Sequence, residues 1–191
     1  MANRLETGRD KSGAMALNRP VGSQILAATA DNCTLVAVIG VATFKLAPSF
    51  KQAAQAARLA GSLLIVVDMA ACTSMDSTFM GTLAALGFAA NKEGAPGLVL
   101  INLSVAASAL LKGLGMNRIL KTYPAGALPD GMGNLSPLVA SLRPVDSSPA
   151  NARDMAALMY DAHETLTRVD PENLQRFKDV LAFLREDIQR L

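Results

Sequence analysis

Short apolar runs of strand length alternate along the first two thirds of the chain with longer, Ala-rich segments of helical spacing. Strands are expected over residues 23–29, 34–42, 62–69, 97–103 and 117–124, and helices over residues 48–61, 77–94 and 104–115. Asp31 and Asn32 supply turn residues between the first two strands, which predicts a hairpin. The order of elements predicts an α/β domain over residues 23–125, in which helices pack on a mixed, largely parallel sheet.

Two of the strand segments, residues 62–69 and 97–103, contain continuous apolar runs, at residues 63–67 and 97–101. Such runs are typical of strands that are covered on both faces of a sheet. The segments outside the domain differ in pattern. Residues 1–22 are polar and are expected to be a flexible segment with no signal peptide, and residues 126–150, rich in proline and glycine, are predicted to be a linker or meandering surface segment.

Residues 151–191 predict a helical hairpin. In the first helix one face carries five apolar residues, which are Met155, Leu158, Met159, Ala162 and Leu166. The second helix opens with Asp170-Pro171-Glu172, and its apolar residues follow a heptad spacing at Leu174, Phe177, Leu181, Leu184, Ile188 and Leu191. This pattern predicts packing on the hairpin itself, on the main domain or on a second copy, so self-association through residues 174–191 is one expectation.

The composition narrows the classes of function. The chain is 51% hydrophobic, its net charge is only +2 and its aromatic content is 4%, so neither a nucleic-acid surface nor a polybasic membrane tail is expected. Two cysteines and one histidine do not make a zinc site, and no cofactor is predicted. Free thiols fit a reducing compartment, which predicts a cytoplasmic protein. The long uncharged run over residues 94–111 is interpreted as a strand and a helix because it contains Pro96 and Asn102, so no membrane span is predicted.

The polar cluster Asp76-Ser77-Thr78 stands directly before an apolar helical segment. A helix cap is one interpretation of it, because Asp and Ser side chains satisfy the free N–H groups of a first turn. The chain has no G-x-S-x-G pattern and no phosphate-binding glycine loop. Ser77 cannot be matched to a general base in the sequence, since His163 lies in the C-terminal helices and is expected to be a solvated surface residue. No catalytic residue is therefore predicted, and an enzyme with a site in residues 124–150 is disfavoured.

The segment LLIVVDMAACTSMDSTFMGTLAAL resembles the STAS family, named for sulphate transporters and anti-sigma factor antagonists. The family pattern is a strand that ends in Asp, a short loop, and then D-S-S/T-G-hydrophobic-G at the start of a helix. Asp68 matches the end of the strand, Asp76-Ser77-Thr78 matches D-S-S/T, and Gly81 matches the second glycine. The later stretch LLKGLGMNRILKTYP resembles the third helix and last strand of the family, so the resemblance covers residues 23–125.

The resemblance implies a bacterial anti-sigma factor antagonist that takes part in transcription regulation. In similar proteins an anti-sigma factor with serine kinase activity phosphorylates the serine after the Asp, which here is Ser77, with Thr78 as the second choice. The implied partner-binding residues are Asp76, Ser77, Thr78, Phe79 and Thr43. A phosphate at a helix start is locally tolerated because backbone N–H groups and the helix dipole favour negative charge there. The alternative is a non-catalytic STAS scaffold subunit of a larger signalling assembly, with the hairpin as its assembly element.

The chain departs from the family pattern at two places. Phe79 replaces the usual glycine, and an exposed Phe there would alter the partner surface or fill a pocket beside the site. Many members carry an acid after the glycine of the second strand, whereas here Gly40 is followed by Val41, Ala42 and Thr43. Recognition by a typical partner kinase is therefore in question. Cys72, in the loop before the motif, is expected to be a small packed residue and not a redox switch.

Overall fold

The computed structural model describes residues 22–92, 95–146 and 151–191, so the predicted flexible segment 1–22 lies outside the described residues except for Gly22. The strands are β1 Gln24–Ala30, β2 Cys33–Ala42, β3 Leu64–Asp68, β4 Cys72–Met75, β5 Gly97–Leu103, β6 Lys121–Pro124 and β7 Arg143–Pro144. The helices are α1 Ala47–Leu59, α2 Ser77–Ala90, α3 Val105–Gly113, α4 Ser136–Ser141, α5 Ala152–Val169 and α6 Asn173–Arg190, with a short 3-10 helix η1 at Met116–Arg118.

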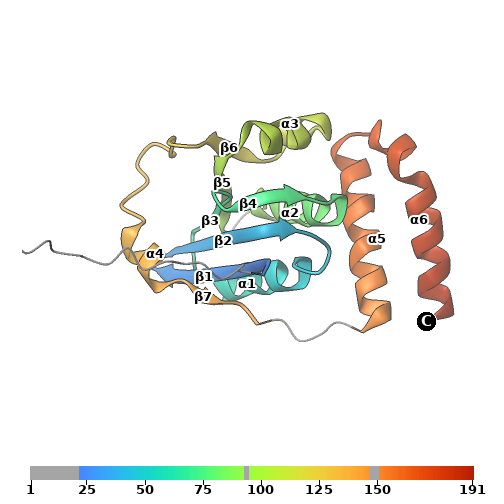
Figure 1. Cartoon of the computed structure of the whole chain (residues 1–191), viewed down its shortest axis with the longest axis horizontal. Coiled ribbons are helices and arrows are strands. Elements are labelled where there is room, and N and C mark those ends of the chain that lie inside the picture. Colours follow the sequence, from blue (N-terminus) through green and yellow to red (C-terminus); the bar gives the residue numbers. More distant parts are fainter. Residues whose placement is uncertain (1–21, 93–94, 147–150) are drawn as a thin grey trace, which may run out of the picture.

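The predicted mixed sheet is confirmed (Figure 1). Its strand order is β6-β5-β3-β2-β1-β7, and β4 pairs separately with the end of β2. Strands β2, β3, β5 and β6 are parallel, β1 pairs antiparallel with β2, and β7 pairs antiparallel with β1 at the edge of the sheet. The predicted β1–β2 hairpin turns at Asp31 and Asn32, whose φ angles of 48° and 61° are those that a two-residue hairpin turn requires.

Side chains of the central strands alternate between the two faces of the sheet, as the pleat of a strand dictates. On β3, Ile65 and Val67 lie in the main core with α1 and α2, whereas Val66 points into a second, smaller cluster on the opposite face. On β5, Leu98 and Leu100 share the main core. Both faces are therefore buried, which agrees with the apolar runs in the sequence.

The second face is covered by part of the segment that the sequence predicted to be a linker. Helix α4 places Leu138 on this face, and β7 pairs with β1 at the sheet edge through Arg143 and Pro144. Proline is compatible with both elements, because Pro137 stands in the first turn of α4 and Pro144 in an edge strand. Residues 132–144 are thus part of the packed structure, because the apolar second face of β3 and β5 needs a cover.

The structure differs from the sequence prediction at two places. β4 was not predicted, because its four residues are half exposed and depend on pairing with the end of β2. The predicted strand over residues 117–124 begins only at Lys121, after η1. In both cases tertiary pairing decides the conformation of a segment whose own periodicity is weak.

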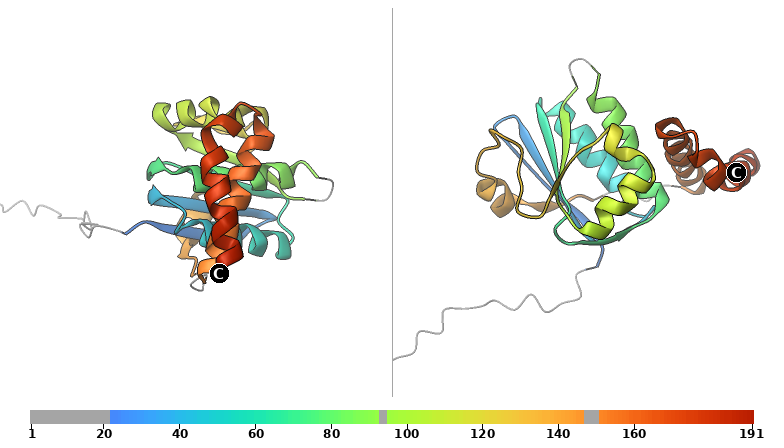
Figure 2. Two further views of the ribbon diagram at one scale, coloured as in Figure 1. Left: turned by 90° about the vertical axis from the view of Figure 1, so that its right-hand side faces the viewer. Right: turned by 90° about the horizontal axis from the view of Figure 1, so that it is seen from above.

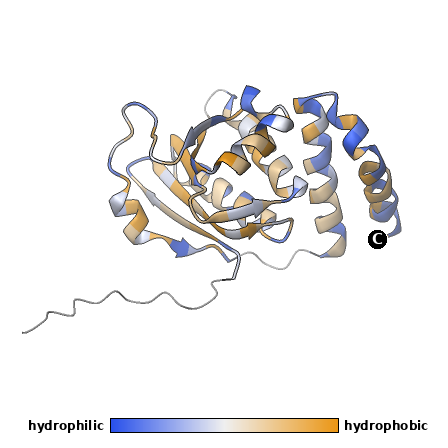
Figure 3. Ribbon diagram, turned by 45° about the horizontal axis from the view of Figure 1, so that its top comes forward, coloured by the Kyte–Doolittle hydropathy of each residue, from blue (hydrophilic) through white to orange (hydrophobic). Residues whose placement is uncertain are grey.

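The C-terminal hairpin of α5 and α6 stands across the end of the sheet toward which β2 points (Figures 1 and 2). α5 packs against α2, and α6 packs against α5 on the far side (Figure 2). Leu166 and Val169 of α5 are buried in the main core, so the hairpin and the α/β domain share that core. Hydrophobic residues line the strands of the sheet, whereas the turn of the hairpin is hydrophilic (Figure 3). None of the described helices is long and apolar enough to cross a membrane.

The backbones of α2 and α5 approach each other closely at Gly81. A Cβ atom added there would lie 2.2 Å from the carbonyl oxygen of Ala162, a backbone atom that cannot turn away. The resemblance to the family pattern included this glycine, and the structure shows its physical use in this chain: it lets the two helix backbones meet.

We expect Gly81→Ala to destabilise the protein by about 1–3 kcal/mol, because the added methyl group forces α5 away from α2. Gly113→Ala is the matched control, since a Cβ at that helical glycine meets nothing within 4 Å. Its effect should be neutral or stabilising by up to about 1 kcal/mol. Urea unfolding of the two variants measures the difference, and equal stabilities would contradict this account of the helix contact.

Candidate functional site at the start of helix α2

Asp76 organises the start of α2. Its backbone is extended, with φ −91° and ψ 170°, and its side chain accepts a hydrogen bond from the Phe79 N–H at 2.8 Å. The second carboxylate oxygen accepts from the Phe44 N–H at 2.7 Å. The cap interpretation of the cluster is therefore confirmed, and Asp76 is the cap. The same carboxylate fastens the β2–α1 loop, which contains Thr43, beside the motif.

Ser77 is the first residue of α2 and is not its cap. Its Oγ lies 2.9 Å from Nε2 of His163 on α5, 86 residues further along the chain. The prediction that His163 is a solvated surface residue is wrong, because its exposed fraction is 3%. It lies on the face of α5 that is turned toward α2, and the ring of Phe177 packs against it at 5.0 Å between centroids.

The hydrogen bonds of His163 define which ring nitrogen carries the proton. Nδ1 lies 2.7 Å from the carbonyl oxygen of Met159, which can only accept, so Nδ1–H donates. In the neutral ring Nε2 is then the acceptor, and the Ser77 hydroxyl donates to it. Ser77 therefore has a basic neighbour after all, which the sequence could not reveal because the two residues meet only through the packing of α5.

Phe79 and Thr78 turn inward. Each residue of a helix advances the side-chain direction by about 100°, so residues that follow Ser77 leave the outer face at once. Phe79 is 0% exposed and packs against Phe50 at 5.1 Å between ring centroids. The expectation of an exposed Phe79 is wrong: its side chain fills the main core beneath the first turn of α2. Of the five predicted partner-binding residues, Thr78 and Phe79 are buried, whereas Thr43, Asp76 and Ser77 are half-buried around one point.

The first Asp of the motif has a structural role. Asp68 ends β3, and its Oδ1 accepts from the Ala70 N–H and from Nδ2 of Asn102, both at 2.9 Å. Asn102 lies near the end of the neighbouring strand β5 and has a φ of 57°. The Asp68 carboxylate thus joins the ends of two parallel strands on the side of the sheet where the loop to the motif begins.

A serine hydrogen-bonded to a histidine is a component of nucleophilic catalysis, but a substrate also needs space. Two surface cavities of about 470 Å³ and 370 Å³ are lined by other residues, the first beside α1 and the C-terminal half of α2, the second between α1 and α5. Neither is lined by Ser77 or His163. In this conformation the pair is a packed contact between two helices.

The other reactive side chains do not extend the site. Cys33 and Cys72 are both free thiols, and burial raises the pKa of each above its ordinary value, which keeps them protonated near neutral pH. Cys72 lies in β4, and its Sγ contacts the carbonyl of Ser74 at 3.4 Å. No cluster of three or more His, Cys, Asp or Glu side chains among the described residues could hold a metal ion.

His163 is the residue that the sequence interpretation missed. A signal was present, because His163 follows Met159 by four residues and precedes Leu166 by three, which places it on the apolar stripe of α5. A lone polar residue within such a stripe is expected to be buried and to need a hydrogen-bond partner.

We expect Asp76→Ala to lower the free energy of unfolding by about 1–3 kcal/mol, because it removes the helix cap and also leaves the Phe44 N–H without its acceptor. Ser104→Ala is the control: Ser104 caps α3 through a single exposed hydrogen bond from the Ala107 N–H at 3.1 Å, so its loss should be nearer 0.5–1 kcal/mol, roughly. Thermal or urea unfolding compares them, and a larger loss for the Ser104 variant would argue against the double role of Asp76.

Known proteins include a domain family and a solved structure to which this chain is similar. A family model described as "Mlab, STAS domain" matches residues 25–121 of the 191 residues. A crystal structure from Thermotoga maritima, described as that of a candidate anti-sigma factor antagonist, is similar with a TM-score of 0.45 and 18% sequence identity, over 51% of this chain and 83% of that one. No curated protein sequence matches the chain.

Proposed function

This chain belongs to the STAS domain family, and from that premise we propose that it is a bacterial, cytoplasmic anti-sigma factor antagonist without catalytic activity of its own. In this proposal the chain binds an anti-sigma factor with serine kinase activity when Ser77 is unmodified, and releases it when Ser77 is phosphorylated. Thr78 is the second choice for the modified residue. The contact surface includes Asp76, Ser77 and Thr43.

The observation that carries the proposal is that Asp76, and not Ser77, caps helix α2. Because the Asp76 carboxylate caps α2, the Ser77 hydroxyl at the first helical position is not needed as a helix cap. The burial of Thr78 favours Ser77 over Thr78 as the modified residue. The buried Phe79 takes part only indirectly, by supporting the first turn from beneath.

A phosphate on Ser77 changes the surface without requiring a new fold. It adds about −1.5 to −2 charges at neutral pH, and the N-terminal end of α2 partly stabilises that charge. Asp76 stands next to it and repels it, and a partner that packs on this point would have to desolvate both groups. The expected result is loss of binding while the domain stays folded.

Substitutions at Ser77 test the switch. Ser77→Ala should bind the anti-sigma partner captured from the native cell and should resist phosphorylation. Ser77→Asp should bind it at least about tenfold more weakly, or ~1.4 kcal/mol. Thr78→Ala is the control and should leave phosphorylation intact. Mass spectrometry of the phosphosite and titration calorimetry are the measurements.

Equal binding by the Ala and Asp variants, with no phosphate on either hydroxyl in cells, would remove the switch. Phosphate on Thr78 alone would move it by one residue.

A second candidate function is the non-catalytic scaffold subunit of a larger signalling assembly. The outer face of α6 favours it, because two apolar side chains there, Val180 and Phe183, are exposed and lie about 60° apart around the helix axis at 100° per residue. Phe183 is 64% exposed, which is unusual for a large apolar side chain on a packed helix. The predicted heptad stripe, in contrast, faces α5 at Leu184, so any self-association through residues 174–191 would use the neighbouring face.

Phe183→Asp distinguishes the two candidates. If α6 is an assembly surface, the variant should have a lower mass in solution than the unmodified protein at equal concentration, with unchanged helicity, because a charge opposes burial of this face. Leu184→Asp is the contrast: Leu184 is buried against α5, so that variant should lose helical content. Light scattering and circular dichroism are the measurements. An unmodified protein that is already monomeric would leave no role for α6 in self-assembly.

A further inference from the structure

The C-terminal hairpin covers the proposed switch residue. His163 of α5 holds the Ser77 hydroxyl at 2.9 Å, and one turn further along α2 the backbone of Ala162 lies against Gly81. A phosphoryl group on Oγ would break the hydrogen bond to His163, and a partner protein that binds this face of α2 would need the surface that α5 occupies. The side of Ser77 that faces α5 can therefore be contacted by a partner only after α5 moves.

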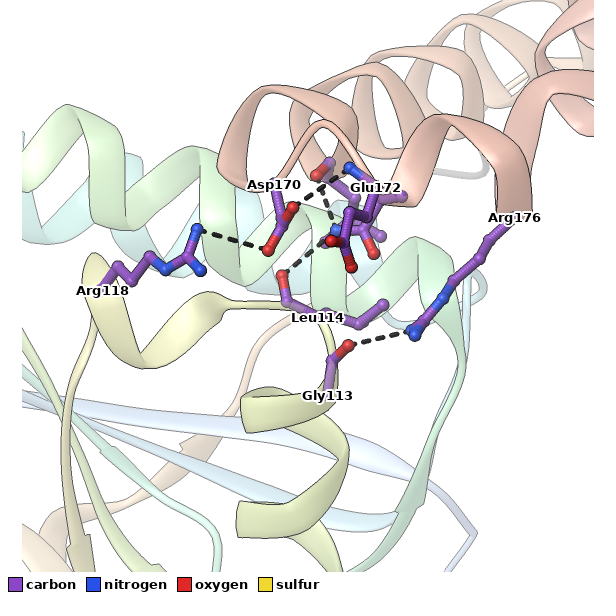
Figure 4. Close-up of polar contacts among 8 residues, drawn as sticks. Gly113, Leu114, Arg118, Asp170, Glu172 and Arg176 are labelled. Atoms are coloured by element: carbon purple, nitrogen blue, oxygen red, sulfur yellow. Dashed lines mark hydrogen bonds and ion pairs between the residues drawn. The ribbon is translucent and has the colours of Figure 1, made fainter.

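Polar contacts at the turn of the hairpin fasten it to the domain (Figure 4). Asn173, which is 2% exposed, donates through Nδ2 to the Leu114 carbonyl of the domain at 3.1 Å and, within the hairpin, to the Leu166 carbonyl at 2.9 Å. Arg118 pairs with Asp170 at 3.3 Å, and Arg176 donates to the Gly113 carbonyl at 2.9 Å. We name Arg118, Asp170, Asn173 and Arg176 the clasp.

At the clasp the turn of the hairpin and the α3–η1 loop lie close together and are joined by polar contacts. The loop after α3 turns at Gly115, where φ is 74°, and a Cβ there would lie 3.1 Å from the Asp170 carboxylate. Arg118 and Arg176 make their bonds at the surface, where water can replace a broken hydrogen bond at little cost. The hairpin itself is joined along its length, since α6 packs on α5 and Arg185 donates to the Tyr160 hydroxyl at 2.8 Å. These contacts allow α5 and α6 to leave as one unit.

We propose that the α5–α6 hairpin is a releasable cover of the Ser77 surface, held closed by the clasp on the α3–η1 loop. In the closed state the anti-sigma partner and its kinase are excluded from Ser77, and in the open state they compete with α5 for the same face of α2. Opening and partner binding are then linked: opening favours binding, and binding favours opening by the same factor. The regulatory meaning of the cover rests on the proposed function, whereas its opening does not.

The opening can be measured without a partner, by the reaction of a cysteine at position 77 with a small maleimide. We would replace Ser77 by Cys in the full chain with Cys33→Ala and Cys72→Ala, so that a single thiol remains. Ser104→Cys in the same background is the matched control, because Ser104 also stands at a helix N-terminus but is exposed. The thiol of Ser77→Cys should react at least about tenfold more slowly, or ~1.4 kcal/mol.

Weakening the clasp should then accelerate the reaction at position 77 alone. Asn173→Ala should raise the rate at least about fivefold, and Arg118→Ala, a milder surface change, should raise it less; neither should alter the rate at position 104. Arg190→Ala is the control within the hairpin, because it breaks only the exposed pair with Glu186 and should change neither rate. Circular dichroism of every variant checks that the fold is kept.

Three results would contradict the proposal that the hairpin covers Ser77. The first is an equal rate of maleimide reaction at positions 77 and 104 with the clasp intact, and the second is a slow reaction at position 77 that no clasp variant accelerates. The third is equal acceleration at both positions by the clasp variants, which would mean that the clasp stabilises the whole fold. The proposed function fails differently. If the clasp variants release position 77 as expected but Ser77 is neither phosphorylated nor bound by an anti-sigma partner in any variant, the cover stands and the switch does not.

Discussion

The close approach of α2 and α5 at Gly81 is the contact on which the rest of the site depends. Without a side chain at this position the backbone of Ala162 reaches α2, and the neighbouring His163 is carried to the Ser77 hydroxyl. The same contact brings Leu166 and Val169 into the main core. The missing side chain at Gly81 thus lets α5 lie close enough to cover part of the start of α2.

The start of α2 also shows how helix capping can leave a neighbouring residue free. Asp76 satisfies a first-turn N–H with one oxygen and holds the β2–α1 loop with the other, so the helix does not depend on Ser77. Phe79 supports the same turn from below, against Phe50. A modification of Ser77 would therefore affect the contact with α5 or with a bound partner, and helix α2 itself would stay folded.

The hairpin contact combines two kinds of interaction with different consequences. The apolar and backbone contact between α2 and α5 supplies burial, whereas the clasp at the turn supplies orientation through hydrogen bonds and one ion pair. The bonds of Arg118 and Arg176 lie at the surface and exchange readily with water, whereas Asn173 is 2% exposed, so Asn173 is the clasp residue that holds the turn most firmly.

The sequence by itself determined the α/β order, the β1–β2 turn and the start of α2, because these depend on local periodicity, on turn residues and on a capping Asp. It also contains the motif from which Ser77 is predicted to be the phosphorylated residue. It did not show that residues 132–144 cover the second face of the sheet, since that need arises only when apolar strands such as β3 and β5 lie side by side. Nor could it place His163 on Ser77 or bury Phe79. His163 meets Ser77 because α5 packs on α2, and Phe79 is buried because it packs against Phe50 of α1; tertiary packing sets both contacts, and no local pattern records them.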